Sequence, residues 1–377
     1  MNYLLVDISG RCPNYDIALC DALHKVLLPS GRLKLFATNI NPDEVECDCC
    51  KLINFIPRNV QKSKCIAARA IKACLVLLNY LYLTLLLLFS KADVLHFQWL
   101  PLIEVSSVEK FLLKFMRFVS PKTKFVLTIH NIYPHDCNEK GKDSYKKRFA
   151  SVEVFFDKFI VHLKTSKNVF CSDFNISENR VKVFPHGVFS PKDLKVVPHK
   201  RGEKLNLIMY GNQSYYKGTD ILVDALAMLP KEKKNKVHTL IVGKTDPDYL
   251  DLLKAKARDS DITFNPEFIS DDDLYKSIMK SDIIVVPYRE ISQSGVLLLA
   301  LSFKRMIVVS DIPSFRETLG GFDSDAFFES DNPASLSKLI TKYIDGLVDE
   351  KKQLRVVDDL VNRLSWEKIA ELYINLF

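Results

Sequence analysis

Residues 281–311, SDIIVVPYREISQSGVLLLALSFKRMIVVSD, decide the fold class of this chain. The β-branched apolar run at 282–287 predicts a buried strand of a parallel sheet. A polar loop follows, then an apolar run at 296–303 that predicts a helix, and a second β-branched run at 306–309 that predicts the next strand. This order predicts a strand–helix–strand unit of an α/β protein.

The polar loop of this stretch ends at Ser294 and Gly295, directly before the expected helix. A loop in this position can bind an anion, because the first N–H groups of the helix are free and the helix dipole is positive there. Gly295 would let a phosphate approach the backbone, since glycine has no Cβ. The alternative is an ordinary strand–helix turn in which Ser292 or Ser294 is only the helix N-cap.

The alternation of strands and helices continues on both sides of this stretch. At 377 residues, 47% of them hydrophobic and 26% charged, the chain is long enough for two globular domains. We expect two Rossmann-like, doubly wound domains at 1–188 and 205–364, joined by a polar linker at 189–204. A last helix at 365–377 is expected to return towards the N-terminal domain.

Ligands of doubly wound sheets bind beyond the carboxyl ends of the strands. We therefore expect the two domains to face each other across a cleft lined by the residues that directly follow strands. These are residues 9–11, 96–99, 130–131, 186–187, 211–212, 243–244 and 288–295. The basic segment 140–148 is expected to be a polar loop.

Positive charge is concentrated in the first half of the chain. Residues 1–190 hold 26 Lys/Arg and 17 Asp/Glu, a net charge of +9, whereas residues 191–377 carry −2. This indicates an anionic partner, which could be nucleic acid, acidic lipid or a phosphorylated substrate. All nine cysteines precede residue 172 and no signal peptide precedes the first expected strand, so we expect free thiols in the cytoplasm. The cluster Cys47, Cys49 and Cys50 is interpreted as a loop of free thiols; the alternative, a metal site, lacks a second ligand pair.

Two expected helices of the N-terminal half have features of membrane contact. The helix 62–90 contains no charge at 73–89 and is interpreted as a helix of the domain; the alternative is that it also enters one leaflet. The helix 107–118 interleaves basic and aromatic residues, which suits a membrane surface or a helix whose long side chains extend over the core. We expect peripheral contact with anionic lipid at the inner face of the cell membrane, through Lys110, Lys114 and Arg117.

Residues 210–218, YGNQSYYKG, form another strand–loop–helix junction. Lys217 lies where a helix begins and can reach a diphosphate as a point charge, while Gly211 and Gly218 permit the turns around it. The segment is neither a Walker loop nor a GxGxxG fingerprint, because the spacing of its glycines and the residues after Lys217 do not match. We expect Lys217 to be exposed in the cleft and functional; the alternative is an exposed lysine without a role.

Short motifs occur in a fixed order along the whole chain: DVLH at 93–96, TIHN at 128–131, PHG at 185–187, KGTD at 217–220, VG at 242–243, VPY at 286–288, SG at 294–295, SD at 310–311 and WE at 366–367. Each motif is weak alone, but their order and spacing are specific. Together they resemble the family-4 glycosyltransferases, which are two-domain GT-B enzymes that use nucleotide sugars and retain the anomeric configuration.

The resemblance implies transfer of a sugar from a nucleotide-diphosphate sugar to a saccharide or lipid-linked saccharide, in bacterial surface polysaccharide synthesis. It implies that the nucleotide sugar is a co-substrate with no further cofactor, and that nucleic acid is not a partner. His130 and Lys217 would be catalytic, with His130 hydrogen-bonded near the donor sugar; the alternative for His130 is a buried structural role, which we expect for His96 and His162. No Asp-x-Asp motif follows a strand, so we expect no metal.

By the same resemblance, the donor would be bound by Gly211, Asn212, Lys217, Gly243, Tyr288, Glu290, Ser292, Gln293, Ser294, Gly295 and Val296. The acceptor side would be formed by Gly10, Arg11, Gln98, Trp99, Asn131 and His186.

The sequence departs from the family pattern at the paired glutamates that flank the phosphate loop. The second falls on Leu299, which cannot hydrogen-bond a ribose, and the first on Ile291, with Glu290 beside it. Asn212 stands where a basic residue is usual. The alternative function is therefore a catalytically impaired GT-B partner or binding subunit. An epimerase would need a pair of carboxylates in the cleft, which the sequence does not place there.

Overall fold

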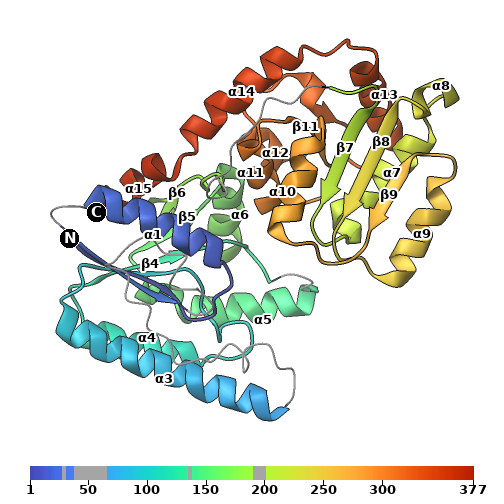
Figure 1. The fold of residues 1–377 in the computed structure, drawn as a ribbon. Helices are drawn as coiled ribbons and strands as arrows, with labels where there is room; N and C mark the ends of the chain where they lie inside the picture. The colour runs from blue at the N-terminus through green and yellow to red at the C-terminus, as the bar shows by residue number, and fades with distance from the viewer. Residues whose placement is uncertain (28–30, 38–65, 135–137, 190–200, 292) are drawn as a thin grey trace. The chain divides into compact units, whose positions relative to one another are not determined.

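The structure is a computed structural model of the full chain, and it describes residues 1–27, 31–37, 66–134, 138–189, 201–291 and 293–377. The chain divides into two compact units. The N-terminal unit comprises Met1–Gly187 together with Ser365–Phe377, and the C-terminal unit comprises Val188–Leu364. Each unit contains a parallel six-stranded sheet with helices on its faces (Figure 1).

The sheet of the N-terminal unit has the strand order β2-β1-β3-β4-β5-β6. Because successive side chains of a strand point to opposite faces, β1 contributes Leu4 and Val6 to one core and Tyr3 and Leu5 to the other. The first core is covered by α3 to α6, and the second by α1 and the last helix of the chain, α15. The elements of this unit are β1 (Asn2–Asp7), α1 (Pro13–Leu27), β2 (Arg32–Ala37), α3 (Ile66–Ser90), β3 (Val94–Phe97), α4 (Val108–Val119), β4 (Lys124–Thr128), α5 (Glu139–Ala150), β5 (Lys158–Val161), α6 (Lys164–Phe174), β6 (Val181–Val183) and α15 (Trp366–Ile374).

The sheet of the C-terminal unit has the order β12-β11-β10-β7-β8-β9. One face is covered by α7, α9 and α13, and the other by α10, α11, α12 and α14. Polar residues that cap the helix N-termini, among them Asp246, Ser270 and Asn332, define where several of these helices begin. The elements are β7 (Leu205–Tyr210), α7 (Thr219–Ala227), α8 (Lys231–Lys234), β8 (Val237–Val242), α9 (Pro247–Ala257), β9 (Ile262–Asn265), α10 (Asp271–Lys280), β10 (Ile283–Val286), α11 (Gly295–Ser302), β11 (Met306–Ser310), α12 (Pro313–Thr318), β12 (Phe327–Phe328), α13 (Pro333–Ile344) and α14 (Glu350–Arg363).

These strand orders confirm the predicted α/β class with two doubly wound sheets. Each sheet reverses its strand order at one point, which lies between β1 and β3 in the first unit and between β7 and β10 in the second. Open α/β sheets bind ligands beyond the carboxyl ends of the strands at this point. The loops after Asp7 and Phe97, and those after Tyr210 and Val286, are therefore where the topology places sites.

Two expectations about the N-terminal unit are wrong. The segment 140–148 is not a loop but lies in α5, whose N-cap Asn138 accepts a hydrogen bond from the Gly141 N–H. The pattern was missed because most of the residues of α5 are polar, although Phe149 at its end is buried. Cys20 is disulfide-bonded rather than free, whereas Cys12, Cys74 and Cys171 are free thiols. The Cys47–Cys50 cluster and linker residues 190–200 lie outside the described residues.

Candidate functional site

Three glycines shape the reversal point of the C-terminal sheet. Gly211, directly after β7, and Gly243, directly after β8, have φ values of +96° and +126°, and a Cβ on Gly243 would lie 2.4 Å from the Gly211 carbonyl oxygen. Gly218 has a φ of +68°, and its Cβ would lie 1.9 Å from the Pro287 carbonyl oxygen. Only glycine fits these three positions, so the ends of the strands approach one another closely.

Lys217 lies among these three glycines. Its Nζ is 2.9 Å from the position that a Cβ on Gly211 would take, and it lies over the Tyr288 ring, 5.5 Å from the centroid. The expectation that Lys217 is exposed is wrong, since the residue is 8% exposed. Burial lowers the pKa of its ammonium group to about 8. Among the residues that the structure describes, no carboxylate pairs with this ammonium, so it remains available to an anion.

Arg289 holds the two loops of this site together, a role that sequence reasoning missed. Its guanidinium pairs with Asp220 through two bonds of 3.0 and 2.8 Å, and it also bonds Asp331 at 2.9 Å. It donates to the Tyr215 carbonyl and lies over the Tyr215 ring at 3.9 Å, while its own N–H donates to the Tyr216 carbonyl at 2.8 Å. Arg289 is therefore a positioning residue that ties the loop after β10 to the turn carrying Lys217. The basic residue after a buried strand was the available sequence signal.

The N-terminus of α11 forms the other side of the site. Ser294 is its N-cap, and its Oγ accepts a hydrogen bond of 3.1 Å from the Leu297 N–H. Gly295 is exposed, and a Cβ there would approach only Phe189, at 3.7 Å, so the approach to the first N–H groups of α11 is open. The Val296 carbonyl accepts from the Tyr210 hydroxyl at 2.8 Å, which fixes α11 against β7. The structure thus shows both the helix cap and the open N-terminus that the sequence left as alternatives.

The other predicted donor-binding residues occupy different positions around this site. Tyr288 is buried beneath Lys217, and Gln293 is half-buried with an Oε1 that has no hydrogen-bond partner in the described chain. Asn212 and Glu290 are exposed, and Ser292 lies outside the described residues. Leu299 packs partly buried against the apolar cluster of this unit, so its side chain contributes no polar group.

The N-terminal unit has a cavity of about 320 Å³ at its own reversal point. Apolar atoms form most of its wall, and polar groups are contributed by residues such as Arg11, Glu104 and Asn131. The residues that line it are Arg11, Cys12, Trp99, Leu100, Ile103, Glu104, Leu127, Thr128, Ile129, His130, Asn131, Tyr133, Pro134, Tyr145 and Phe149. The topology therefore brings together four of the predicted residues, which are Arg11, Trp99, His130 and Asn131.

A buried carboxylate holds the loop that carries Arg11. Asp7 accepts hydrogen bonds from the backbone N–H groups of Ser9, Gly10 and Arg11 at 2.9–3.0 Å. Arg11 in turn pairs with Glu104, with one bond of 2.9 Å, and its guanidinium lies over the Trp99 ring at 5.0 Å. One wall of the cavity is thus formed by Trp99, with a fixed cation over its ring and a carboxylate paired to that cation.

His130 lines this cavity and contacts other aromatic rings. Its ring stacks on Trp99, with centroids 5.3 Å apart and an angle of 17°, and it contacts Tyr15 edge-on at 4.8 Å. Burial, together with neighbouring histidines, lowers the pKa of His130 well below its ordinary value. The imidazole is therefore neutral near pH 7 and cannot donate a proton as an imidazolium.

The hydrogen bonds decide which ring nitrogen of His130 carries its proton. The His162 Nδ1–H donates to the Phe184 carbonyl at 3.0 Å, and burial lowers the pKa of His162 to about 4, so its Nε2 must accept. His130 Nδ1, 3.3 Å away, is then the donor, and its Nε2 is an acceptor that lies 3.0 Å from the side-chain oxygen of Gln98. The Gln98 nitrogen lies 3.3 Å from the His96 Nε2. Because two acceptors cannot bond each other, this tautomer of His130 requires the two ends of the Gln98 amide to be exchanged, with the nitrogen towards His130 and the oxygen towards His96. Both nitrogens of His130 are engaged, so a hydrogen bond to a substrate would replace the Gln98 contact.

The remaining predicted acceptor-side residues do not line the cavity. Gln98 is fully buried and acts on the cavity through His130. His186 is buried between the rings of Tyr15 and Trp366, at 4.8 and 5.5 Å. Gly10 has a φ of +58° and serves the turn that Asp7 holds. The described residues contain no group of three or more metal-ligating side chains, and the expectation of no metal stays a prediction.

Comparisons with known proteins agree with this architecture. Residues 192–356 match the family model of the glycosyl transferases group 1. An uncharacterised glycosyltransferase of Methanocaldococcus jannaschii is 23% identical over 266 residues, and the aligned part covers 65% of this chain and 65% of that relative.

Solved structures resemble the chain over its full length. A glycosyltransferase from Rickettsia africae has a TM-score of 0.69 at 17% identity, covering 100% of this chain and 97% of that one. The Anabaena protein HepE, in complex with UDP and glucose, has a TM-score of 0.65 at 14% identity, covering 100% and 99%. At these identities the likeness shows the fold.

Proposed function

We propose that this protein, a glycosyltransferase of the GT-B fold, transfers a sugar from a nucleoside diphosphate sugar to the hydroxyl of a saccharide or lipid-linked saccharide. The observation that carries this proposal is Lys217, a buried cation without a described carboxylate partner, beside the open N-terminus of α11. A structural similarity to a protein bound to UDP and glucose supports a nucleotide sugar as donor. We propose retention of the anomeric configuration from the resemblance alone.

The chemistry of the donor side follows from where charge develops during transfer. When the bond between the sugar and the diphosphate breaks, negative charge grows on the leaving diphosphate. An ammonium and free N–H groups that face this charge lower the barrier, because they are fixed before the reaction begins. Lys217 and the first turn of α11 supply such groups without a metal ion. We therefore propose that the reaction proceeds without a metal, and we expect EDTA to leave the rate unchanged.

The cavity of the N-terminal unit suits a sugar acceptor. Arg11 and His130 lie over the Trp99 ring, so Tyr133 and Tyr145 contribute the aromatic surface against which the apolar side of a sugar ring can pack. Glu104, Asn131 and Arg11 offer hydrogen bonds to its hydroxyl groups. The cavity of about 320 Å³ is large enough for one or two sugar rings. We propose that this cavity binds the terminal sugar of the acceptor, and that His130 in its wall is oriented by Gln98 and His162.

A donor panel tests the proposed function. The purified protein is incubated with UDP-, GDP- and dTDP-sugars and a mixture of oligosaccharide acceptors, and release of the nucleoside diphosphate is measured. We expect one donor class to be consumed, and we expect Lys217→Ala to lower turnover by about two orders of magnitude. Lys236→Ala, which changes an exposed lysine directly before β8 at the opposite end of the strand, is the matched control and should retain activity. Absence of turnover together with absence of UDP, GDP and dTDP binding would refute the proposal.

A second function, that of a nucleotide-binding partner without turnover, is favoured by one observation. Leu299 occupies the position of the second glutamate, and its side chain packs against the apolar cluster. Such a protein would bind a nucleoside diphosphate but release none from any donor. In that case Leu299→Glu should tighten nucleotide binding, because a carboxylate would then be available to the ribose hydroxyls. If Leu299→Glu only destabilises the unit, the leucine is part of the core and the partner function gains no support from it.

A further inference from the structure

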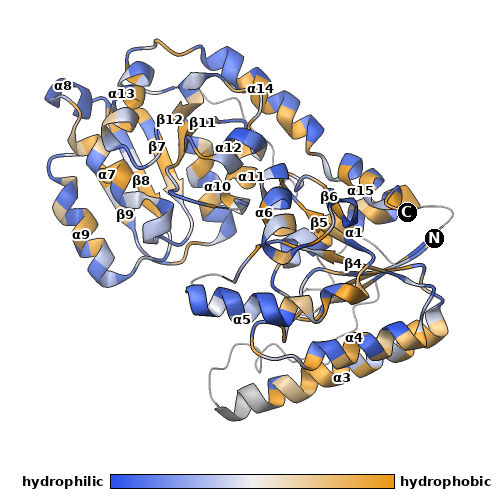
Figure 2. Ribbon diagram, turned by 180° about the vertical axis from the view of Figure 1, so that it is seen from behind, coloured by the Kyte–Doolittle hydropathy of each residue, from blue (hydrophilic) through white to orange (hydrophobic). Residues whose placement is uncertain are grey.

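The long helix α3 of the N-terminal unit has two opposite faces. One face carries Tyr80, Leu83 and Leu87, which are buried in the core beneath the sheet. The opposite face exposes large apolar side chains at helical spacing. These are Ile71, Leu77, Leu78, Leu81, Leu85, Leu88 and Phe89, each between 42% and 83% exposed. Figure 2 shows that apolar residues extend along most of α3. Monomeric proteins rarely leave so large an apolar stripe in water.

The buried face of α3 decides whether this helix can cross a bilayer or can only lie against its surface. By length and composition α3 could cross a bilayer, since residues 71–90 have a mean hydropathy of 2.1. To cross, it would have to leave the sheet, because Tyr80 and its neighbours on that face are core residues. The Tyr80 hydroxyl also donates to the buried Glu109 carboxylate at 2.6 Å, which would lose its partner. The helix therefore stays on the sheet and offers only its outer face.

The neighbouring helix α4 extends this face. The two helices lie side by side in both ribbon views (Figures 1 and 2). Phe111, Phe115 and Phe118 are 68%, 54% and 81% exposed along one stripe of α4, and Lys110 and Lys114 form an exposed stripe beside it. An amphipathic helix with aromatic residues next to lysines is typical of the membrane interface.

Arg117 does not belong to this surface, which corrects its predicted role. It pairs with Asp157 at 2.7 Å, donates to the Thr123 carbonyl at 2.7 Å and lies over the Phe125 ring at 4.1 Å. Arg117 therefore holds α4 on the sheet and is not available to a lipid headgroup.

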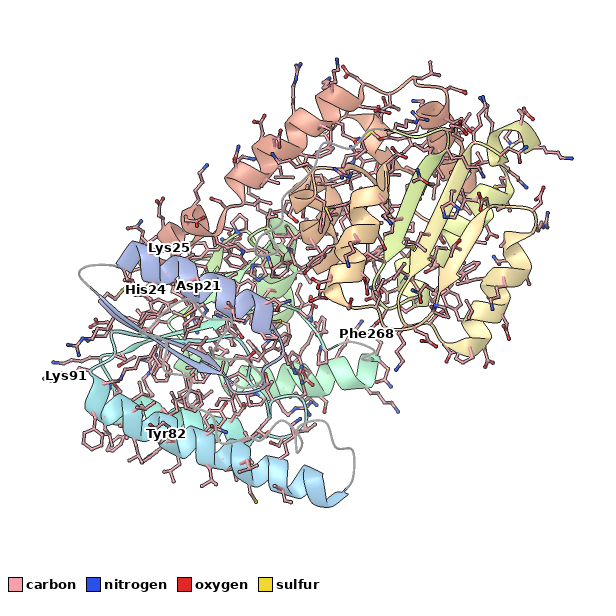
Figure 3. The ribbon with its side chains drawn as sticks, in the orientation of Figure 1. Asp21, His24, Lys25, Tyr82, Lys91 and Phe268 are labelled. Atoms are coloured by element: carbon pink, nitrogen blue, oxygen red, sulfur yellow. The ribbon has the colours of Figure 1, made fainter. Side chains whose placement is uncertain are left out.

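Cations without carboxylate partners lie at the edge of the apolar face. A cavity of about 160 Å³ at the end of α3 is lined by Arg32 and Lys34 together with Leu86 and Phe89 of α3. Lys91, the residue directly after α3, projects outward (Figure 3). None of Arg32, Lys34, Lys91, Lys110 and Lys114 forms an ion pair with a described residue. The described parts of α3 and α4 contain one acidic residue, Glu109, and it is buried.

We propose that the outer faces of α3 and α4 form a docking surface for an anionic lipid bilayer, with both helices lying in the plane of the interface. The apolar side chains would enter the acyl boundary, and Arg32, Lys34, Lys91, Lys110 and Lys114 would bind lipid phosphates. A second copy of the chain fits less well, because a two-fold contact would place this positively charged surface against an identical, positively charged surface.

The docking surface is continuous with the proposed acceptor cavity. Leu100, Ile103 and Glu104 line that cavity, and the same segment continues through exposed Val105 to the start of α4. The Leu102 N–H donates to Glu109 of α4 at 3.1 Å, which fixes the segment to the helix. A bilayer against α4 would therefore lie next to the acceptor cavity, as a lipid-linked acceptor requires. Docking itself is independent of the donor site and of turnover.

Co-sedimentation of the full-length protein with vesicles tests this proposal. We expect binding to vesicles of phosphatidylcholine with 30% phosphatidylglycerol at 0.1 M NaCl, and weaker binding at 0.5 M, since salt screens the charges. Lys110→Gln with Lys114→Gln should weaken partitioning about thirtyfold, at about fivefold for each lysine near the surface. Lys236→Gln with Lys280→Gln, two exposed lysines of the other unit, is the matched control and should bind as wild type.

Insertion of α3 is measured separately. In Leu81→Trp, the new indole should be quenched by brominated lipid, whereas in Leu252→Trp, at a similarly exposed position of α9, it should not. Because both sites are on the surface, neither change should lower the unfolding temperature. Equal affinity of wild type for neutral and anionic vesicles, quenching of both tryptophans, or a stable dimer in solution that buries Leu81 and excludes vesicles would each overturn the proposal.

Discussion

The buried ammonium of Lys217 predicts that nucleotide binding depends on pH in a defined direction. Burial lowers the pKa of this group to about 8 in the free protein. A diphosphate beside it favours the charged form, so binding raises the pKa and takes up a proton. With a free-state pKa of about 8, roughly nine tenths of the lysine is charged at pH 7 and roughly one tenth at pH 9. The dissociation constant for UDP should therefore increase about tenfold from pH 7 to pH 9.

Calorimetric titration of UDP at pH 7, 8 and 9 measures this effect. The phosphate of UDP itself does not interfere, because its last proton dissociates near pH 6. Lys217→Gln should weaken UDP binding at pH 7 by about thirtyfold or more, as expected for removal of a desolvated charge partner, and should abolish the pH dependence. Lys236→Gln, at an exposed lysine directly before β8, should keep both the affinity and the slope. A wild-type affinity that is constant between pH 7 and 9, or an unchanged slope in Lys217→Gln, would show that this ammonium does not bind the diphosphate.

Three further predictions concern groups that position the sites or the core. Arg289→Lys should weaken UDP binding about tenfold in calorimetry, because an ammonium cannot replace the two-bond pair with Asp220. Unchanged affinity would show that Arg289 does not position the UDP site. Burial, and next the charge of Asp7, raise the pKa of Asp16, so the stability that this carboxyl contributes is present below its unfolded pKa and is lost as pH rises. Asp16→Asn should therefore raise the unfolding temperature at pH 7, by about 2–4 °C for each kcal/mol of unfolding free energy regained. A lower unfolding temperature would contradict this. Burial lowers the pKa values of His96, His162 and His186 to between about 3 and 4, so acid favours the unfolded chain. The free energy of unfolding, measured with denaturant, should therefore fall by about 1.4 kcal/mol per pH unit for each histidine between pH 6.5 and 4. A free energy of unfolding that stays constant over this range would show that the histidines are charged in the fold.

Strand positions in the fold were predictable from local sequence. Buried parallel strands require continuous β-branched and aliphatic runs, so β10 and β11 were recognised within one residue of their ends. The helix α5 was missed, because its polar residues form no strong apolar stripe and it is held by an N-cap and by one buried residue at its end.

Candidate site residues were predictable where neighbouring residues in the sequence alone require them. Gly211, Ser294 and Gly295 follow strands at positions where a turn or a helix N-terminus requires such residues, and the structure places them at the reversal point. The burial of Lys217 was not predictable, because it results from Tyr288, which is distant in sequence. The clamp of Arg289 on Asp220 was missed for the same reason, since its two partners are 69 residues apart.

The sequence by itself determined the α/β class, the strand-end positions of the candidate residues and the uneven charge, because these depend on residue type and on periods of two and 3.6 along the chain. Only the tertiary structure decided which of these residues meet and which are exposed. The apolar run of α3 is uniform in sequence, yet Tyr80 is buried and Leu81 is 54% exposed, because only one side of a helix can face the sheet. Arg117 and Lys114 likewise lie in one basic helix, but packing holds the first against Asp157 and leaves the second in solvent.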